Sequence, residues 1–119
     1  MSKSIVQEKS FEFSLKIIKL YKKMLEQNEY VLSKQLLRSG TSIGANIEEA
    51  TAGISKKDFA AKMSISSKEA RETRYWLKLI DKSDLVNMDV NEELKLVEDL
   101  INILTSIVKT SQKNINNGF

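Results

Sequence analysis

The sequence predicts an all-α fold: an up-down antiparallel four-helix bundle in a single domain that spans residues 1–119. The chain has no proline and only four glycines, so few positions force the backbone out of a helix. Apolar residues recur at intervals of three and four along four segments. A chain of 119 residues suffices for one hydrophobic core and is too short for two ordinary domains. We expect helices at about residues 4–27, 30–52, 56–82 and 90–115.

The first expected helix carries two apolar stripes that lie side by side. Their spacing is typical of an amphipathic helix with one wide apolar face. One stripe contains Phe11, Leu15, Ile18 and Leu25, and the other contains Phe13, Ile17, Leu20 and Met24. The polar residues 26–29 then interrupt the apolar period without a glycine or a proline, so we expect the first turn there.

The second expected helix contains RSGTSIGANIEEA at residues 38–50, a stretch with small residues where a bundle helix ordinarily carries leucine. Its inward stripe reads Leu32, Leu36, Ser39 or Gly40, Ile43, Ile47 and Ala50. Each glycine costs about 1 kcal/mol of helix propensity relative to alanine, so close packing or a function should offset it. We expect Gly44 to let the third helix approach.

The third expected helix begins at Ser55, which with Asp58 resembles a capping box. Its inward seam is small at the middle and large at both ends. The seam consists of Phe59, Met63, Ser66, Ala70, Thr73, Leu77 and Ile80. If the second and third helices form an antiparallel hairpin that turns near Ile54, small residues face small residues. The same register places Arg38 level with Ala70.

The fourth expected helix follows Asp89 and Glu92, which repeat the start signal. It also carries two apolar stripes. They are Val90, Leu94, Val97, Ile101, Leu104 and Val108, beside Leu96, Leu100, Ile103 and Ile107. Two interpretations of the double stripes on the first and fourth helices stay open. They form a subunit interface, which makes the protein a homo-oligomer, or they form a broad core-facing surface.

A polar cluster is expected where the second and third helices meet. In the predicted register Arg38 lies between Glu69 and Glu72, two carboxylates beside the apolar seam that need a partner. A guanidinium can pair with them and fix the helix register. Further polar residues continue from Arg38 at helical spacing, namely Ser42, Asn46 and Glu49. The cluster is either structural or a functional site, since perturbed groups and ion-pair networks occur in both.

Residues 54–82 are basic, with eight Lys or Arg against four Asp or Glu. One stripe of the third helix combines cations with an aromatic residue, the composition of a nucleic-acid contact surface. It contains Lys68, Arg71, Tyr75, Lys78 and Lys82, with Arg74 beside it. Charged stripes of this kind also occur simply as solvated helix faces.

Composition narrows the chemistry further. Without cysteine or histidine the chain lacks thiol nucleophiles, disulfides, ordinary zinc sites and the commonest general base. Carboxylate metal sites in helical bundles typically include histidine, so Glu48, Glu49, Glu69 and Glu72 do not predict one. We expect no catalytic residue, metal or cofactor. No segment has the apolar length of a membrane span or signal peptide, which favours a cytoplasmic protein without membrane contact.

Two stretches carry a family resemblance: RSGTSIGANIEEA at residues 38–50 and KEARETRYWLKLI at residues 68–80. The chain resembles the four-helix bundle family related to proteins encoded by intervening sequences of bacterial 23S rRNA genes, and more distantly the accessory proteins of diversity-generating retroelements. The resemblance implies an up-down bundle that assembles as a ring-like homopentamer, associates with nucleic acid and has no enzymatic activity. The family positions are Arg38, Ser42, Asn46, Glu49 and Glu69.

Two functions are consistent with these features. One is a non-enzymatic oligomer that associates with RNA or DNA through the basic stripe. Several copies of the stripe in one oligomer would raise the overall affinity even if each contact is weak. The other is a protein-binding scaffold that contacts no nucleic acid. Salt separates them, because phosphate contacts weaken steeply with salt and apolar docking does not.

Overall fold

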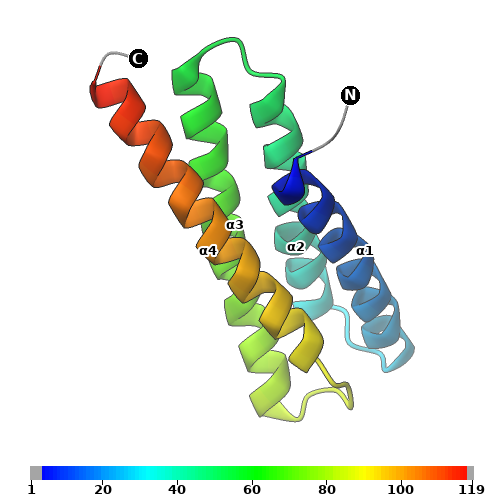
Figure 1. Cartoon of the computed structure of the whole chain (residues 1–119). Coiled ribbons are helices and arrows are strands. Elements are labelled where there is room, and N and C mark those ends of the chain that lie inside the picture. The colour runs from blue at the N-terminus through cyan, green and yellow to red at the C-terminus, as the bar shows by residue number, and fades with distance from the viewer. Residues whose placement is uncertain (1–3, 118–119) are drawn as a thin grey trace.

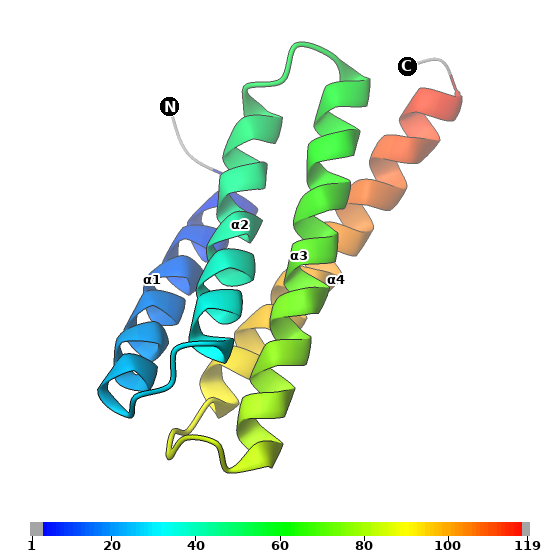
Figure 2. The same cartoon turned by 180° about the vertical axis from the view of Figure 1, so that it is seen from behind.

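Four antiparallel helices make up the computed structural model, which describes residues 4–117. They are α1 (Ile5–Glu26), α2 (Leu32–Thr51), α3 (Lys56–Ser83) and α4 (Asn91–Asn116). Figure 1 shows them as an elongated bundle, and Figure 2 shows from behind that α2 lies between α1 and α3. The interface between α1 and α4 is the smallest of the four helix pairs. The predicted four-helix bundle is confirmed, and each helix boundary lies within two residues of its expected place.

The helix ends explain how the chain turns with so few glycines. Asn28, after α1, and Asp84, after α3, adopt left-handed backbone conformations with φ values of 62° and 57°. Asn and Asp tolerate this region better than other non-glycine residues. At the helix starts, Ser55 accepts a hydrogen bond from the Asp58 backbone, which is the N-cap half of the predicted capping box. Ser4 forms a complete capping box with Gln7.

The start of α2 is capped by a carboxylate that precedes it. Glu29 Oε1 accepts hydrogen bonds from the backbone N–H groups of Val31 and Leu32 at 3.0 and 2.8 Å, and its Oε2 accepts one from Ser33 at 2.7 Å. Burial opposes ionisation of Glu29, but the three backbone donors outweigh it and lower the pKa of this carboxyl. The negative charge also complements the positive end of the α2 dipole.

We expect Glu29→Gln to destabilise the bundle by about 1 kcal/mol, the usual scale for loss of a helix cap. A carboxyl whose pKa is lower in the folded state stabilises the fold above its unfolded pKa. This contribution is lost as the pH falls through the folded pKa. Urea unfolding at neutral and acidic pH should therefore show a smaller acid loss in Glu29→Gln than in the wild type. Glu26→Gln, at an exposed glutamate, is the control, and equal acid losses in all three proteins would contradict the assignment.

The core follows the predicted seams. Most inward positions of α2 and α3 are buried, including the small middle of α3, and so is the α1 stripe that contains Phe13 and Ile17. Leu32 and Phe59 are partly buried. The largest fully buried side chains are Phe13, Ile17, Met24, Leu36, Ile43, Ile47, Met63, Leu77, Ile80, Val90, Leu100 and Leu104. Only apolar residues occur among them, so burial of hydrocarbon surface is the main source of stability.

The second stripe of α4 belongs to a broad core-facing surface, one of the two interpretations that the sequence left open. Leu100 is fully buried, and the other stripe members pack partly buried against the core. The reason is that α4 contacts α3 and α1 together and needs a wide apolar face to do so. On α1, by contrast, Phe11 and Leu15 are 58% and 47% exposed. The single chain therefore leaves apolar surface exposed on α1.

The expectation that Gly44 lets α3 approach α2 closely is wrong. A Cβ atom at Gly40 would lie 2.8 Å from Cγ2 of Ile17, and one at Gly44 would lie 3.4 Å from Oγ of Ser10. Both neighbours belong to α1, so the two glycines face α1. Apolar periodicity identifies the inner side of α2 but does not say which of its two neighbours each small residue meets.

Candidate functional site

The predicted pairing of Arg38 with two glutamates is present. Nη1 of Arg38 donates to Oε2 of Glu69 at 3.1 Å, and Nη2 donates to Oε2 of Glu72. The guanidinium thus spans two carboxylates one helical turn apart on α3. The antiparallel register of α2 and α3 brings the guanidinium and both carboxylates to the same height, and the hydrogen bond that Arg38 donates to Glu72 raises the pKa of Arg38.

Trp76 completes this cluster and was not predicted. Its indole N–H donates to the same Glu72 oxygen at 2.9 Å, one turn along α3. The indole and then Arg38 lower the pKa of Glu72, so the carboxylate stays ionised. We call Arg38, Glu69, Glu72 and Trp76 the Arg38 cluster. The i, i+4 spacing of Glu72 and Trp76 is the signal that could have revealed the contact.

The side chains of the remaining predicted cluster residues make no hydrogen bond or ion pair with the Arg38 guanidinium in the described part of the chain. Ser42 Oγ donates to the Arg38 carbonyl at 2.6 Å, and Asn46 Nδ2 donates to the Ser42 carbonyl at 2.8 Å. Glu49 pairs with Lys62 of α3 at 2.8 Å. Ser42 and Asn46 therefore satisfy backbone groups of α2, and Glu49 makes a separate contact to α3.

Beneath the Arg38 cluster, buried hydroxyls join α2 to α3. Ser66 Oγ donates to the Ile43 carbonyl at 2.8 Å, and the hydroxyl oxygens of Thr73 and Ser39 lie 2.9 Å apart. All three hydroxyl-bearing residues are fully buried. Here small residues do face small residues, as the sequence predicted for this helix pair.

The basic stripe of α3 divides into two groups. Arg71 donates to Thr105 Oγ1 at 3.0 Å, and Arg74 donates to both carboxylate oxygens of Glu98 at 3.0 and 2.7 Å. These arginines therefore bind α4. Lys68 and Lys78 are exposed. Nζ of Lys82 lies 3.7 Å from Oδ2 of Asp81, and the Lys82 side chain is mostly in solvent.

Tyr75 lies on the exposed side of this stripe. It is 56% exposed and makes an edge-to-face contact with Trp76 at a ring-centroid distance of 5.3 Å. The aromatic contact places Tyr75 between the lysines and the Arg38 cluster. The two sites predicted separately thus lie side by side on α3.

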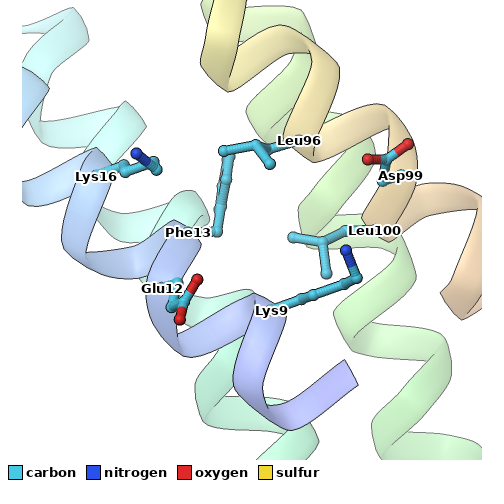
Figure 3. A pocket seen from close by; sticks show the side chains of 7 residues that line it. All are labelled: Lys9, Glu12, Phe13, Lys16, Leu96, Asp99 and Leu100. Carbon is cyan, nitrogen blue, oxygen red and sulfur yellow. The ribbon is translucent and has the colours of Figure 1, made fainter. Parts of the chain in front are cut away.

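One hollow on the surface is smaller than an ordinary ligand pocket. Figure 3 shows it between α1 and α4, where Phe13 points toward Leu96 and Leu100. Its volume is about 80 Å³, below the roughly 300 Å³ at which ligand pockets begin. Within residues 4–117 no group of carboxylates is arranged to hold a metal ion. None of the helices in that range has the length and apolar character needed to cross a membrane.

The fold and the polar contacts between α2 and α3 define the class of this protein: a single-domain, up-down four-helix bundle held in register by hydrogen bonds and ion pairs. The chain matches the family model described as 23S rRNA-intervening sequence protein over residues 2–107, and it belongs to this family. The resemblance carried by residues 38–50 and 68–80 is confirmed.

A solved structure supports the same assignment. The chain is similar to a protein of unknown function from the S23 ribosomal protein family of Bacteroides thetaiotaomicron, with 44% sequence identity and a TM-score of 0.84. The match covers 88% of this chain and 99% of that chain. No curated protein is significantly similar to the chain. Neither of the two descriptions names a reaction.

Proposed function

We propose that this protein is a non-enzymatic, self-associating bundle that binds nucleic acid electrostatically through α3. The observation that carries the proposal is the exposed group Lys68, Tyr75, Lys78 and Lys82 on one helix. Lysines supply phosphate contacts, and an exposed aromatic ring offers a stacking surface for an unpaired base. The family resemblance implies assembly as a homopentamer, which would repeat this group around a ring and raise its avidity.

A groove between α3 and α4 extends the cationic surface. It has a volume of about 420 Å³, and Leu94 is among its lining residues. Four cations line it, namely Arg74, Lys78, Lys82 and Lys95, against two carboxylates, Asp81 and Glu98. The positive excess is suited to a phosphate backbone that follows the groove. The family description, which refers to 23S rRNA, makes RNA the first probe to test.

We expect Lys78→Glu with Lys82→Glu to weaken binding of a labelled single-stranded RNA and to reduce its salt dependence. Each lost phosphate contact should flatten the slope of log K against log salt by about 0.7 units. Lys109→Glu with Lys113→Glu changes the net charge equally at exposed positions near the other end of α4. Fluorescence anisotropy across a salt series measures both. Equal slopes in the wild type and both double variants would rule out the α3 surface.

A second candidate function, a protein-binding scaffold without nucleic-acid contact, also has support. Arg71 and Arg74, two of the predicted cations, already bind Thr105 and Glu98 of α4. The exposed apolar side chains of α1 offer a surface for a protein partner. Absence of RNA and DNA binding at low salt, together with self-association, would favour this candidate.

A further inference from the structure

The exposed apolar residues of α1 border a groove between α1 and α2. The α1/α2 groove has a volume of about 330 Å³. Its lining includes Phe11 and Ile18 of α1 and Gly44, Ala45 and Glu48 of α2. Gly44 and Ala45 keep one wall low, and Phe11 and Ile18 supply apolar surface on the other. The groove has the dimensions to receive a bulky side chain from outside the chain.

Three hydroxyl groups in the α1/α2 groove already donate to carbonyls of their own helices. The Ser10 hydroxyl donates to the Gln7 carbonyl, Ser14 donates to the Ser10 carbonyl, and Thr41 donates to the Leu37 carbonyl. These hydroxyl hydrogens are therefore committed to their own helices. The groove thus presents mainly hydrocarbon to a bound group, which favours an aliphatic side chain over a phosphate or a base.

The chain itself carries a fitting side chain on the adjacent side of the bundle. Ile65 of α3 is 42% exposed. Its neighbour Ser66 contacts the Ile43 carbonyl, and Ile43 is the residue before Gly44. Ile65 and the hollow at Gly44 therefore lie at the same height along the bundle, so two copies standing side by side with parallel axes would bring them together without a shift.

Near the height of Arg38, the α1 side of the groove and the α3 surface around Ile65 carry charges of opposite sign. Glu69 and Glu72 share the single guanidinium of Arg38, so an excess of one negative charge remains there. On α1, Ile17 packs beside Gly40, which places the exposed Lys19 and Lys22 near the height of Arg38. In the same parallel arrangement, these lysines would lie at the height of the carboxylates of the Arg38 cluster in the next copy.

We infer that a second copy of this chain occupies the α1/α2 groove by inserting Ile65 over Gly44. This contact is heterologous, because two different surfaces of the chain meet. The two surfaces are adjacent sides of the bundle that share α2, so each copy can contact one neighbour through its groove and another through Ile65. The inference rests on the self-association proposed above and assigns the surfaces that carry it.

A mixing experiment tests this assignment. Ala45→Glu places a charge in the groove, and Ile65→Glu removes the inserted side chain; both positions are exposed in the single chain. A charge at the centre of an apolar contact should weaken association by about 30-fold or more. In light scattering each variant alone should therefore have the 13.6 kDa mass of one chain. An equimolar mixture should form a two-chain species, because one intact groove and one intact Ile65 remain.

Ile54→Glu is the matched control, since Ile54 is 96% exposed in the turn between α2 and α3 and lies outside both surfaces. It should keep the wild-type mass, and circular dichroism should show all three variants folded. A wild type that stays a single chain overturns the self-association itself. Wild-type mass in Ile65→Glu, or a mixture that remains single chains, overturns the surface assignment alone. A two-chain Ile65→Glu beside a monomeric Ala45→Glu would instead show that the groove pairs with itself.

Discussion

Replacing Gly40 by alanine is expected to lower the melting temperature of the bundle, whereas the same replacement at Gly44 is expected to raise it. Both glycines lie within α2 and face α1, and each substitution recovers up to about 1 kcal/mol of helix propensity. The outcome therefore depends on the space that each added methyl group meets. Thermal unfolding followed by circular dichroism measures both shifts.

At Gly40 the new Cβ would lie 2.8 and 2.9 Å from two carbons of Ile17. Ile17 is fully buried and branched at Cβ, so it has little freedom to move aside. Overpacking of this kind costs about 1 to 3 kcal/mol, which should outweigh the gain in propensity. Gly40→Leu should be worse still, since its added atoms extend into the same contact.

At Gly44 the nearest atom to a new Cβ is the Ser10 hydroxyl oxygen at 3.4 Å, the edge of ordinary contact. The gain in helix propensity should therefore dominate, by up to about 1 kcal/mol. Each kcal/mol corresponds to a shift of about 2 to 8 °C in Tm for domains near this size. Equal melting temperatures for Gly40→Ala and Gly44→Ala would contradict this account of α1–α2 packing.

The sequence predicted the helices and their inner faces because both depend on local patterns. Residues 26–29 marked the first turn by polarity alone, and the structure adds the reason: Asn28 is left-handed and Glu29 caps the next helix. What the sequence could not provide was the identity of each neighbour. Every helix in a four-helix bundle meets two others, and periodicity gives only the mean inward direction. For this reason Gly44 was assigned to α3 although it faces α1.

The candidate sites likewise include contacts that the sequence predicted and contacts that it did not. Arg38 met Glu69 and Glu72 because an antiparallel hairpin fixes the register of α2 and α3 once the turn is known. The partners of Arg71 and Arg74 lie on α4, and no short turn between α2 and α3 determines that register. Arg71 and Arg74, two cations of the predicted basic stripe, therefore form contacts with α4 that the sequence did not predict.

Replacing Thr73 by valine should destabilise the bundle, and a second change, Ser39→Ala, should restore much of the loss. The Thr73 hydroxyl oxygen lies 2.9 Å from that of Ser39 and 2.8 Å from the Glu69 carbonyl. A hydroxyl has one hydrogen, so both contacts are satisfied when Ser39 donates to Thr73 and Thr73 donates to the carbonyl. Valine keeps the shape of threonine but removes the acceptor, which leaves the fully buried Ser39 hydroxyl without this partner.

An unsatisfied buried hydroxyl costs about 1 to 3 kcal/mol, whereas replacing both members of the pair by apolar groups can be nearly neutral. Urea unfolding of the two single variants and the double variant should therefore give a favourable coupling energy between the positions. Additive losses would mean that the Ser39 hydroxyl turns to a carbonyl of α2 when its partner is removed. A coupled result would show that this buried pair, directly beneath Arg38, helps to hold α2 and α3 in the register that brings the guanidinium between its two carboxylates.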